Sequence, residues 1–403
     1  MVLIAKITVE SSYRSLSKVF VTVNLYLNLE FSAPTFSTVK LWVKKIGYYQ
    51  LESVKEKADD WIIITDESIG IGQEKLLVVL GIRQCNIDFT RPLKLQDMEP
   101  ITIKSSEKWT GEDIAKELEI VKTKLGGVKY AVTDAGCNLK KGLKIEGITH
   151  IYDITHAIAN YLARIYEHDA DYKDFTHQAG LMRSRLCCGK NAHLIPPNQR
   201  SKSRFLNMDT ISKWGMEALA ALEKHNLSLS DAEGLKWVKK YKPFIKEMDI
   251  LVSVIEKISV LLKNEGLCKR TKAKCITFLK KCKQSRLARF KEYMMDYFEV
   301  YGKEINSKTK KLLCTSDIIE STFGRYKNVL SKNAMSGITD LSLMIAAFTA
   351  NLTIETVNAA IDGCNVKTLE NWKKNNLCSS LLSKRKEVFG MKRGELNFSK
   401  VAI

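Results

Sequence analysis

The pattern of apolar and polar positions divides the chain into a region where strands alternate with helices and a region that is almost wholly helical. Strand-length apolar runs occur at 62–64, 75–82, 100–104 and 130–132 and just before Asp153, each bounded by glycine or polar residues. Between them, residues 109–124 carry apolar side chains at helical spacing. From 157 to 313 the strand signals fade. This order predicts an α/β sheet followed by a helical region.

The first apolar runs predict a hairpin over residues 61–83, WIIITDESIGIGQEKLLVVLGIR. Its two strands are joined by a short glycine-containing turn, and Asp66 is expected at the end of the first strand. A carboxylate that ends a buried strand needs a partner, a metal or water, because burying it alone is costly. The alternative is an aspartate that only begins the turn.

Two further predicted strands also lead to an aspartate. The strand at 130–132 leads to Asp134 in a glycine-containing turn, and a short strand ends at Asp153, with His156 opening the next helix. An active site needs carboxylates from different strands at one edge of a sheet, and this pattern supplies them.

The N-terminal part predicts two helices, at 13–27 and 36–47, separated by Ser32-Ala33-Pro34-Thr35. Gly47 is expected as the C-cap of the second helix, and Phe36 is expected on its inward face. Polar side chains on the second helix are expected outward, where they could contact a DNA major groove: Thr38, Lys40, Lys44 and Lys45. The pair therefore fits a helix-turn-helix, or else a helical hairpin that only packs on its neighbours.

The balance of charged residues indicates what kind of molecule the protein binds. The chain has 64 Lys and Arg against 45 Asp and Glu, a net charge of +19 and a pI near 9.3. Such an excess indicates a polyanion, either nucleic acid or an anionic membrane surface. No apolar run reaches the roughly 20 residues of a membrane span, the first ten residues lack signal-peptide features, and the ten cysteines include no CxxC pair. We therefore expect a soluble protein in a cytosol-like compartment.

The most basic segment is 263–291, with eleven Lys or Arg against one acid, Glu265. It is expected to form an amphipathic helix or helix pair whose outer surface contacts phosphate, although a charge run can also be a solvated face. A membrane-surface role would need bulky apolar anchors, which this segment supplies only sparsely. The candidates for DNA contact here and in the stretch PPNQRSKSRFLNM (196–208) are Lys280, Lys281, Lys283, Arg200, Lys202 and Arg204.

The last motif is LLCTSDIIESTFGRYKNVLSKN, residues 312–333. Ser316 or Asp317 can cap a helix that has Glu320 in its first turn. The spacing from Asp317 to Glu320 is also that of a capping box, in which Glu320 would serve only the helix N-terminus. At helical spacing, Glu320, Gly324, Lys327 and Ser331 share one face, which suits a metal-bound phosphodiester lying across the helix.

The set Asp66, Asp134 and Glu320 resembles the Asp-Asp-Glu triad of the transposase and retroviral-integrase superfamily. More closely, the chain resembles a group of bacterial insertion-sequence transposases. The similar stretches are collinear over about 38–327: TVKLWVKKIG, ADDWIIITDESIGIGQEKLLVVLGIR, VTDAGCNLKKG, IYDITHAIANYL, PPNQRSKSRFLNM, Trp214-Gly215 and SDIIESTFGRYK. The resemblance implies an α/β ribonuclease-H-like core with a large all-helical insertion, preceded by a small helix-turn-helix domain.

The resemblance also implies a chemistry. The three carboxylates would hold two Mg²⁺ or Mn²⁺ ions for attack on a DNA phosphorus, first by water and later by a 3′-OH. Arg325 and Lys327 would contact DNA near the scissile phosphate. Asp153 and His156 resemble an element that related transposases place after their second aspartate, so they are secondary candidates and Asp153 is the alternative second aspartate.

The implied partners are double-stranded DNA, namely the terminal inverted repeats of a mobile element and its target, and a second copy of the chain in a synaptic complex. No membrane partner is expected, and the implied location is the bacterial cytoplasm, associated with the nucleoid. The alternatives are a nuclease or resolving enzyme on the same fold, and an inactive or domesticated DNA-binding protein.

The expected domain ranges follow from these motifs. They are 1–50 for the helix-turn-helix module, 51–157 for the first part of the core, 158–312 for the basic helical insertion, 313–335 for the glutamate helix and 336–403 for C-terminal helices with a basic tail.

Overall fold

The computed structural model describes residues 11–28, 32–69, 74–199, 205, 208–224, 227–306, 310–330 and 337–390. Its contacts divide the chain into two compact units. Unit 1 contains residues 1–88, 93–151 and 316–403, and unit 2 contains 89–92 and 152–315. The range predicted for the N-terminal module belongs to unit 1, as does the range predicted for the glutamate helix from residue 316 onward, and the range predicted for the insertion belongs to unit 2.

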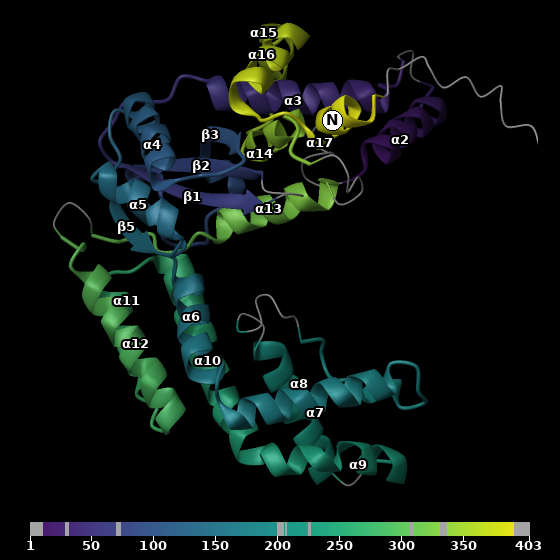
Figure 1. Cartoon of the computed structure of the whole chain (residues 1–403), viewed down its shortest axis with the longest axis vertical. Helices are drawn as coiled ribbons and strands as arrows, with labels where there is room; N and C mark the ends of the chain where they lie inside the picture. Colours follow the sequence, from purple (N-terminus) through teal and green to yellow (C-terminus); the bar gives the residue numbers. More distant parts are fainter. Residues whose placement is uncertain are drawn as a thin grey trace, which may run out of the picture. The chain divides into compact units, whose positions relative to one another are not determined.

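Unit 1 is built on a mixed five-stranded sheet of order β3-β2-β1-β4-β5 (Figure 1). The strands are β1 (Trp61–Ile69), β2 (Lys75–Arg83), β3 (Glu99–Ser106), β4 (Tyr130–Thr133) and β5 (Thr149–Tyr152). All five predicted strands are confirmed. One boundary is wrong: β1 continues to Ile69 because its hairpin pairing with β2 extends that far, so Asp66 lies inside the strand, opposite Val78.

One face of the sheet is covered by α4 (Gly111–Leu125) and α5 (Cys137–Ile145), which pack against each other. The sheet contributes odd-numbered positions to this core, as the alternation of side chains along a strand requires. The core joins Trp61, Ile63, Leu77, Val79, Ile101 and Ala131 to apolar residues of the two helices. Gly126 ends α4, in the left-handed conformation at φ +90°.

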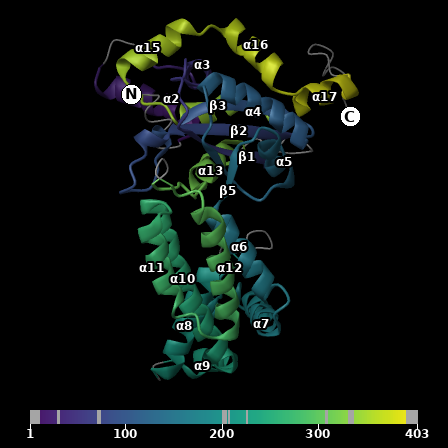
Figure 2. The same cartoon turned by 90° about the vertical axis from the view of Figure 1, so that its left-hand side faces the viewer.

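The remaining helices of unit 1 come from both ends of the chain. Figure 2 shows three of them, α15, α16 and α17, one after another. They are α2 (Tyr13–Tyr26), α3 (Phe36–Glu52), α13 (Asp317–Leu330), α14 (Leu343–Ala347), α15 (Ile354–Gly363), α16 (Val366–Asn376) and α17 (Leu381–Phe389). Val43 and Ile46 of α3 pack with Met344 and Phe348 in a second core cluster.

The predicted end of α3 at Gly47 is wrong. The helix continues to Glu52, and Gly47 lies buried inside it, against α14. A glycine at the end of an apolar pattern can mark a cap or a close helix contact, and only the fold distinguishes the two.

The described residues of unit 2 form helices joined by loops, with an isolated bridge between Leu267 and Leu312 and the last residue of β5, Tyr152. Its helices are α6 (Ile154–Tyr166), α7 (Ala170–Leu186), α8 (Met208–Glu223), α9 (Leu229–Leu235), α10 (Lys242–Glu265), α11 (Lys269–Leu279) and α12 (Ser285–Gly302). α10 packs against α8 and α11, and α11 packs against α12 (Figure 2). Aromatic rings fill the interior: the Phe175 ring lies 5.3 Å from that of Tyr241 and 5.8 Å from that of Phe244.

No helix within the described parts of the chain has both the length and the apolar content that a membrane span needs.

Candidate functional site

Asp66 and Asp134 occupy equivalent positions on neighbouring parallel strands. The ladder between β1 and β4 ends at the pair Ile64 and Val132, and each aspartate lies two residues beyond it. Neighbouring strands lie about 4.8 Å apart, so the two carboxylates leave the sheet from adjacent points. Both side chains are half-buried. The two aspartates therefore have matching positions relative to the β1–β4 ladder, and their joint role in a site stays a prediction.

Main-chain N–H groups orient one oxygen of each aspartate. Glu67 N donates to Asp66 Oδ1 over 2.7 Å, and Gly136 N donates to Asp134 Oδ1 over 2.8 Å. The glycine has a local reason: a Cβ at position 136 would lie 2.9 Å from Asp134 Oδ1. The turn after β4 therefore holds the carboxylate close to its own backbone.

The strand beside β4 supplies a histidine to the same region. His150 of β5 contacts the Thr133 hydroxyl, which also donates to the carbonyl oxygen of Asp134. Burial, followed by the nearby charge of Lys140, lowers the pKa of His150. Sequence reasoning missed this histidine, because a lone His in a short strand gives no motif.

Glu320 lies on α13, the helix that packs against β1 and α14. Its faces follow the predicted division: Ile319 and Phe323 are buried, whereas Gly324 and Lys327 are exposed and Glu320 is half-buried. Among the described residues, a Cβ added at Gly324 would meet no heavy atom within 4 Å outside its own helix. Within the described part of the chain, the face that follows Glu320 along the helix is therefore open at this position.

The three carboxylates fit a divalent metal by chemistry but are not gathered around one point. Their oxygens are the ligands that Mg²⁺ and Mn²⁺ prefer. Among the described residues, however, no group of three or more His, Cys, Asp or Glu has an arrangement that could hold a metal ion. Asp66 and Asp134 lie on neighbouring strands, and Glu320 does not complete a set with them here.

Asp153 and His156 have a different local role. Asp153 is fully buried and is the N-cap of α6: its Oδ1 accepts from His156 N over 2.7 Å and lies 3.1 Å from His156 Nδ1. A buried aspartate at this position is held by the helix that it caps. In the sheet, β4 separates β5 from β1, so Asp134, rather than Asp153, is in register with Asp66.

Two of the three lysines predicted to face DNA from α3, Lys44 and Lys45, contact the protein instead. Lys44 Nζ lies 2.7 Å from Asp340 Oδ2, and Lys45 Nζ donates to Ile361 O over 2.6 Å. Lys40 is half-buried, and Phe36, predicted inward, is 46% exposed. The predicted outward direction of Lys44 and Lys45 is therefore wrong, because the C-terminal part of unit 1 packs over this side of α3.

The other basic residues predicted to contact DNA differ in how exposed their side chains are. Lys280, Lys281 and Lys283 are exposed between α11 and α12, while Leu279 and Cys282 beside them are buried, which confirms a helix pair with basic residues outward. On α13, the Arg325 guanidinium lies 5.8 Å from the centre of the Phe348 ring, and Lys327 is exposed. Arg200, Lys202 and Arg204 lie outside the described residues.

One cation of the basic segment has an internal role that its sequence does not reveal. Arg286 of α12 contacts Asp169 and Glu247 at 2.8 Å and Asp171 at 2.5 Å, and its guanidinium lies 5.3 Å from the ring centre of Phe244. It therefore links α12 to α10 and to the start of α7.

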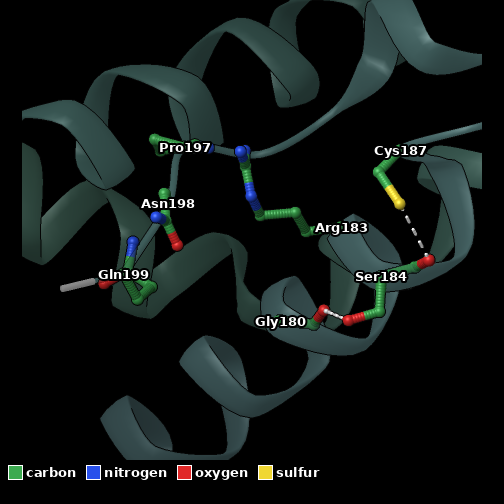
Figure 3. Close-up of a pocket in the computed structure, with 7 residues that line it drawn as sticks. All are labelled: Gly180, Arg183, Ser184, Cys187, Pro197, Asn198 and Gln199. Atoms are coloured by element: carbon green, nitrogen blue, oxygen red, sulfur yellow. Dashed lines mark hydrogen bonds between the residues drawn. The ribbon is translucent and has the colours of Figure 1, made fainter. Parts of the chain in front are cut away.

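Unit 2 also contains an open cavity of about 360 Å³ at the end of α7 (Figure 3). Two of its polar side chains bond to the chain's own backbone: Arg183 Nη1 donates to Pro196 O over 2.7 Å, and Ser184 Oγ donates to Gly180 O over 3.1 Å. The carbonyl end of a helix disfavours anions. We assign no ligand to this cavity.

Comparison with known proteins finds structural neighbours. One of them, the solved structure described as "Drosophila P element transposase strand transfer complex", is similar to this chain with a TM-score of 0.44 and 11% sequence identity, over 88% of this chain and 92% of that one. No protein-family model matches the chain, and no curated protein matches it.

Proposed function

We propose that the protein is a DNA transposase of the insertion-sequence type, which cleaves DNA strands at the ends of a mobile element and joins them to a target. The observation that carries this proposal is the register of Asp66 and Asp134, each two residues beyond the last ladder pair of β1 and β4. The resemblance of the surrounding sequence to such transposases names the reaction, and the register supports the choice of Asp134 as the second aspartate.

In this proposal Asp66 and Asp134 bind divalent metal from neighbouring strands, and Glu320 supplies the third carboxylate from α13. The bound ions, Mg²⁺ or Mn²⁺, supply activation of the attacking oxygen and stabilisation of the leaving oxygen. The protein's own part is to orient the carboxylates: the N–H groups of Glu67 and Gly136 fix one oxygen of each aspartate.

In this proposal, cationic side chains make the contacts with DNA. The open face of α13 places Lys327 one helical turn beyond Gly324, where a phosphodiester can lie against the helix without meeting a side chain at 324. Lys280, Lys281 and Lys283 add sequence-independent affinity from unit 2. Arg325 is a further candidate. A second copy of the chain would be needed to hold two element ends.

The test is a strand-transfer assay in Mn²⁺ with DNA carrying the element's terminal repeats. Asp66→Asn, Asp134→Asn and Glu320→Gln are each expected to lower cleavage and joining by at least a hundredfold at unchanged folding, because each removes a ligand charge without changing size.

The matched controls make the same chemical changes elsewhere in unit 1. Asp59→Asn, at an exposed position just before β1, and Glu370→Gln, on the exposed side of α16, are expected to retain wild-type activity. Wild-type cleavage by both Asp66→Asn and Glu320→Gln would rule out the assignment. Cleaved product without joined product in the wild type would indicate a nuclease on the same fold.

A further inference from the structure

The hydroxyl of Thr133 lies between two groups from neighbouring strands. Its Oγ1 donates to the carbonyl oxygen of Asp134 over 2.7 Å and lies 3.0 Å from His150 Nε2. A threonine hydroxyl has one hydrogen to give. Since that hydrogen goes to Asp134 O, we assign the donor role in the contact with His150 to the imidazole, with the proton on Nε2.

The resulting chain of donors runs from His150 Nε2–H to Thr133 Oγ1–H and on to Asp134 O. Thr133 is fully buried, so water cannot replace either bond without opening the sheet edge. The chain connects β5, β4 and the first residue after β4. It therefore fixes the main chain at the point where Asp134 leaves the sheet.

The opposite side of Asp134 is fixed as well, because its Oδ1 accepts the Gly136 N–H. With the carbonyl held by Thr133 and the carboxylate held by Gly136, the residue has little freedom to turn. We propose that Thr133 and His150 are positioning residues, which hold the backbone of Asp134 so that its carboxylate stays in register with Asp66. The consequence for catalysis rests on the proposed function, whereas the positioning does not.

Hydrogen exchange at the Gly136 amide in the full-length protein tests the positioning directly. Thr133→Val removes the central hydroxyl at constant shape, and His150→Leu removes the first donor. Each is expected to raise the exchange rate at Gly136 by about five- to tenfold, the factor that one net hydrogen bond supplies. The double variant is expected to show no more than the larger single effect, because both changes break the same chain.

Two variants control for chemistry and folding. Thr133→Ser keeps the hydroxyl and is expected to restore wild-type exchange. Thr65→Val makes the Thr-to-Val change at the neighbouring position of β1, where the buried hydroxyl has no hydrogen-bond partner among the residues that the structure describes. This variant is expected to leave exchange at Gly136 unchanged. Wild-type exchange in Thr133→Val, or an equal increase in Thr65→Val, would overturn the proposal.

Calorimetric titration with Mn²⁺ then separates the two proposals. If both hold, Thr133→Val weakens Mn²⁺ binding about fivefold or more, Thr133→Ser does not, and Asp134→Asn abolishes the same binding. If Asp134→Asn leaves Mn²⁺ binding unchanged while Thr133→Val still speeds exchange at Gly136, the positioning stands and the metal-dependent function fails.

Discussion

Gly47 of α3 lies against the backbone of Leu343: a Cβ added to this glycine would be 1.9 Å from the Leu343 carbonyl oxygen. We therefore expect Gly47→Ala to lower the free energy of unfolding by about 1–3 kcal/mol, since overpacking a close contact forces backbone shifts. Gly324→Ala, also inside a helix but with open space around the added methyl, is expected to raise it by about 0.5–1 kcal/mol. Urea unfolding of both variants measures the difference in sign. Equal effects would contradict the close approach of α3 and α14.

Arg286 is predicted to stabilise unit 2 through its three carboxylates. Arg286→Met keeps much of the side-chain volume but leaves Asp169, Asp171 and Glu247 without their shared cation. We expect a loss of about 1–3 kcal/mol, below the range for a fully buried pair because the site is partly exposed. Arg289→Met, at an exposed position of the same helix, is the control and should change stability little. Thermal unfolding followed by tryptophan fluorescence measures both, and similar losses would refute the assigned role.

Glu74 should make stability depend on pH in the direction opposite to that of most acidic residues. Burial raises its pKa above the ordinary 4.5, against the opposing hydrogen bond from Ser105. The folded protein then holds this proton more tightly than the unfolded chain does, so stability is lost as pH rises through the folded pKa. Glu74→Gln is expected to be more stable than the wild type at pH 7, with the difference vanishing below pH 4.5.

The neighbouring Glu107 should affect the pH dependence of stability in the opposite direction to Glu74. Its pairing with Lys384 lowers its pKa, so its contribution is present at neutral pH and lost as pH falls through the folded value. Glu107→Gln should therefore be less stable than the wild type at pH 7 and approach it in acid. Denaturant unfolding at pH 3.5–7 compares the two variants, and parallel pH curves would contradict both assignments.

The exposed lysines between α11 and α12 should determine part of the salt dependence of DNA binding. Replacing Lys280, Lys281 and Lys283 with Gln is expected to reduce the slope of log K against log salt by about 2–3, at about 0.9 per phosphate contact. Lys44→Gln with Lys45→Gln is the comparison, because these ammonium groups already contact Asp340 and Ile361. Fluorescence anisotropy at several salt concentrations measures the slopes. A lower slope in the α3 variant alone would indicate that DNA binds α3.

The sequence predicted the elements whose causes are local. The apolar runs predicted all five strands, and helical spacing predicted that Glu320, Gly324 and Lys327 share one face of α13. Each of these depends on residues within one or two turns or strands, which a single sequence displays.

The features that the sequence did not display depend on distant partners. Gly47 has the local pattern of a cap, and only α14, almost 300 residues later, makes it an interior contact. Arg286 belongs to a basic run by composition, yet its partners on α7 and α10 turn it inward. The donor chain through Thr133 requires β5 to lie beside β4, and no sequence motif indicates this arrangement.

Unit 1 combines segments from both ends of the chain, and this affects its synthesis. Lys44 and its partner Asp340 are 296 residues apart in sequence. At ribosomal rates of about 5–20 residues per second, roughly 15–60 s pass between the appearance of the two. During that interval Val43 and Ile46 have no α14 to cover them. The nascent chain must therefore carry an apolar helix through most of its translation, which makes α3 a natural binding site for chaperones before the protein is complete.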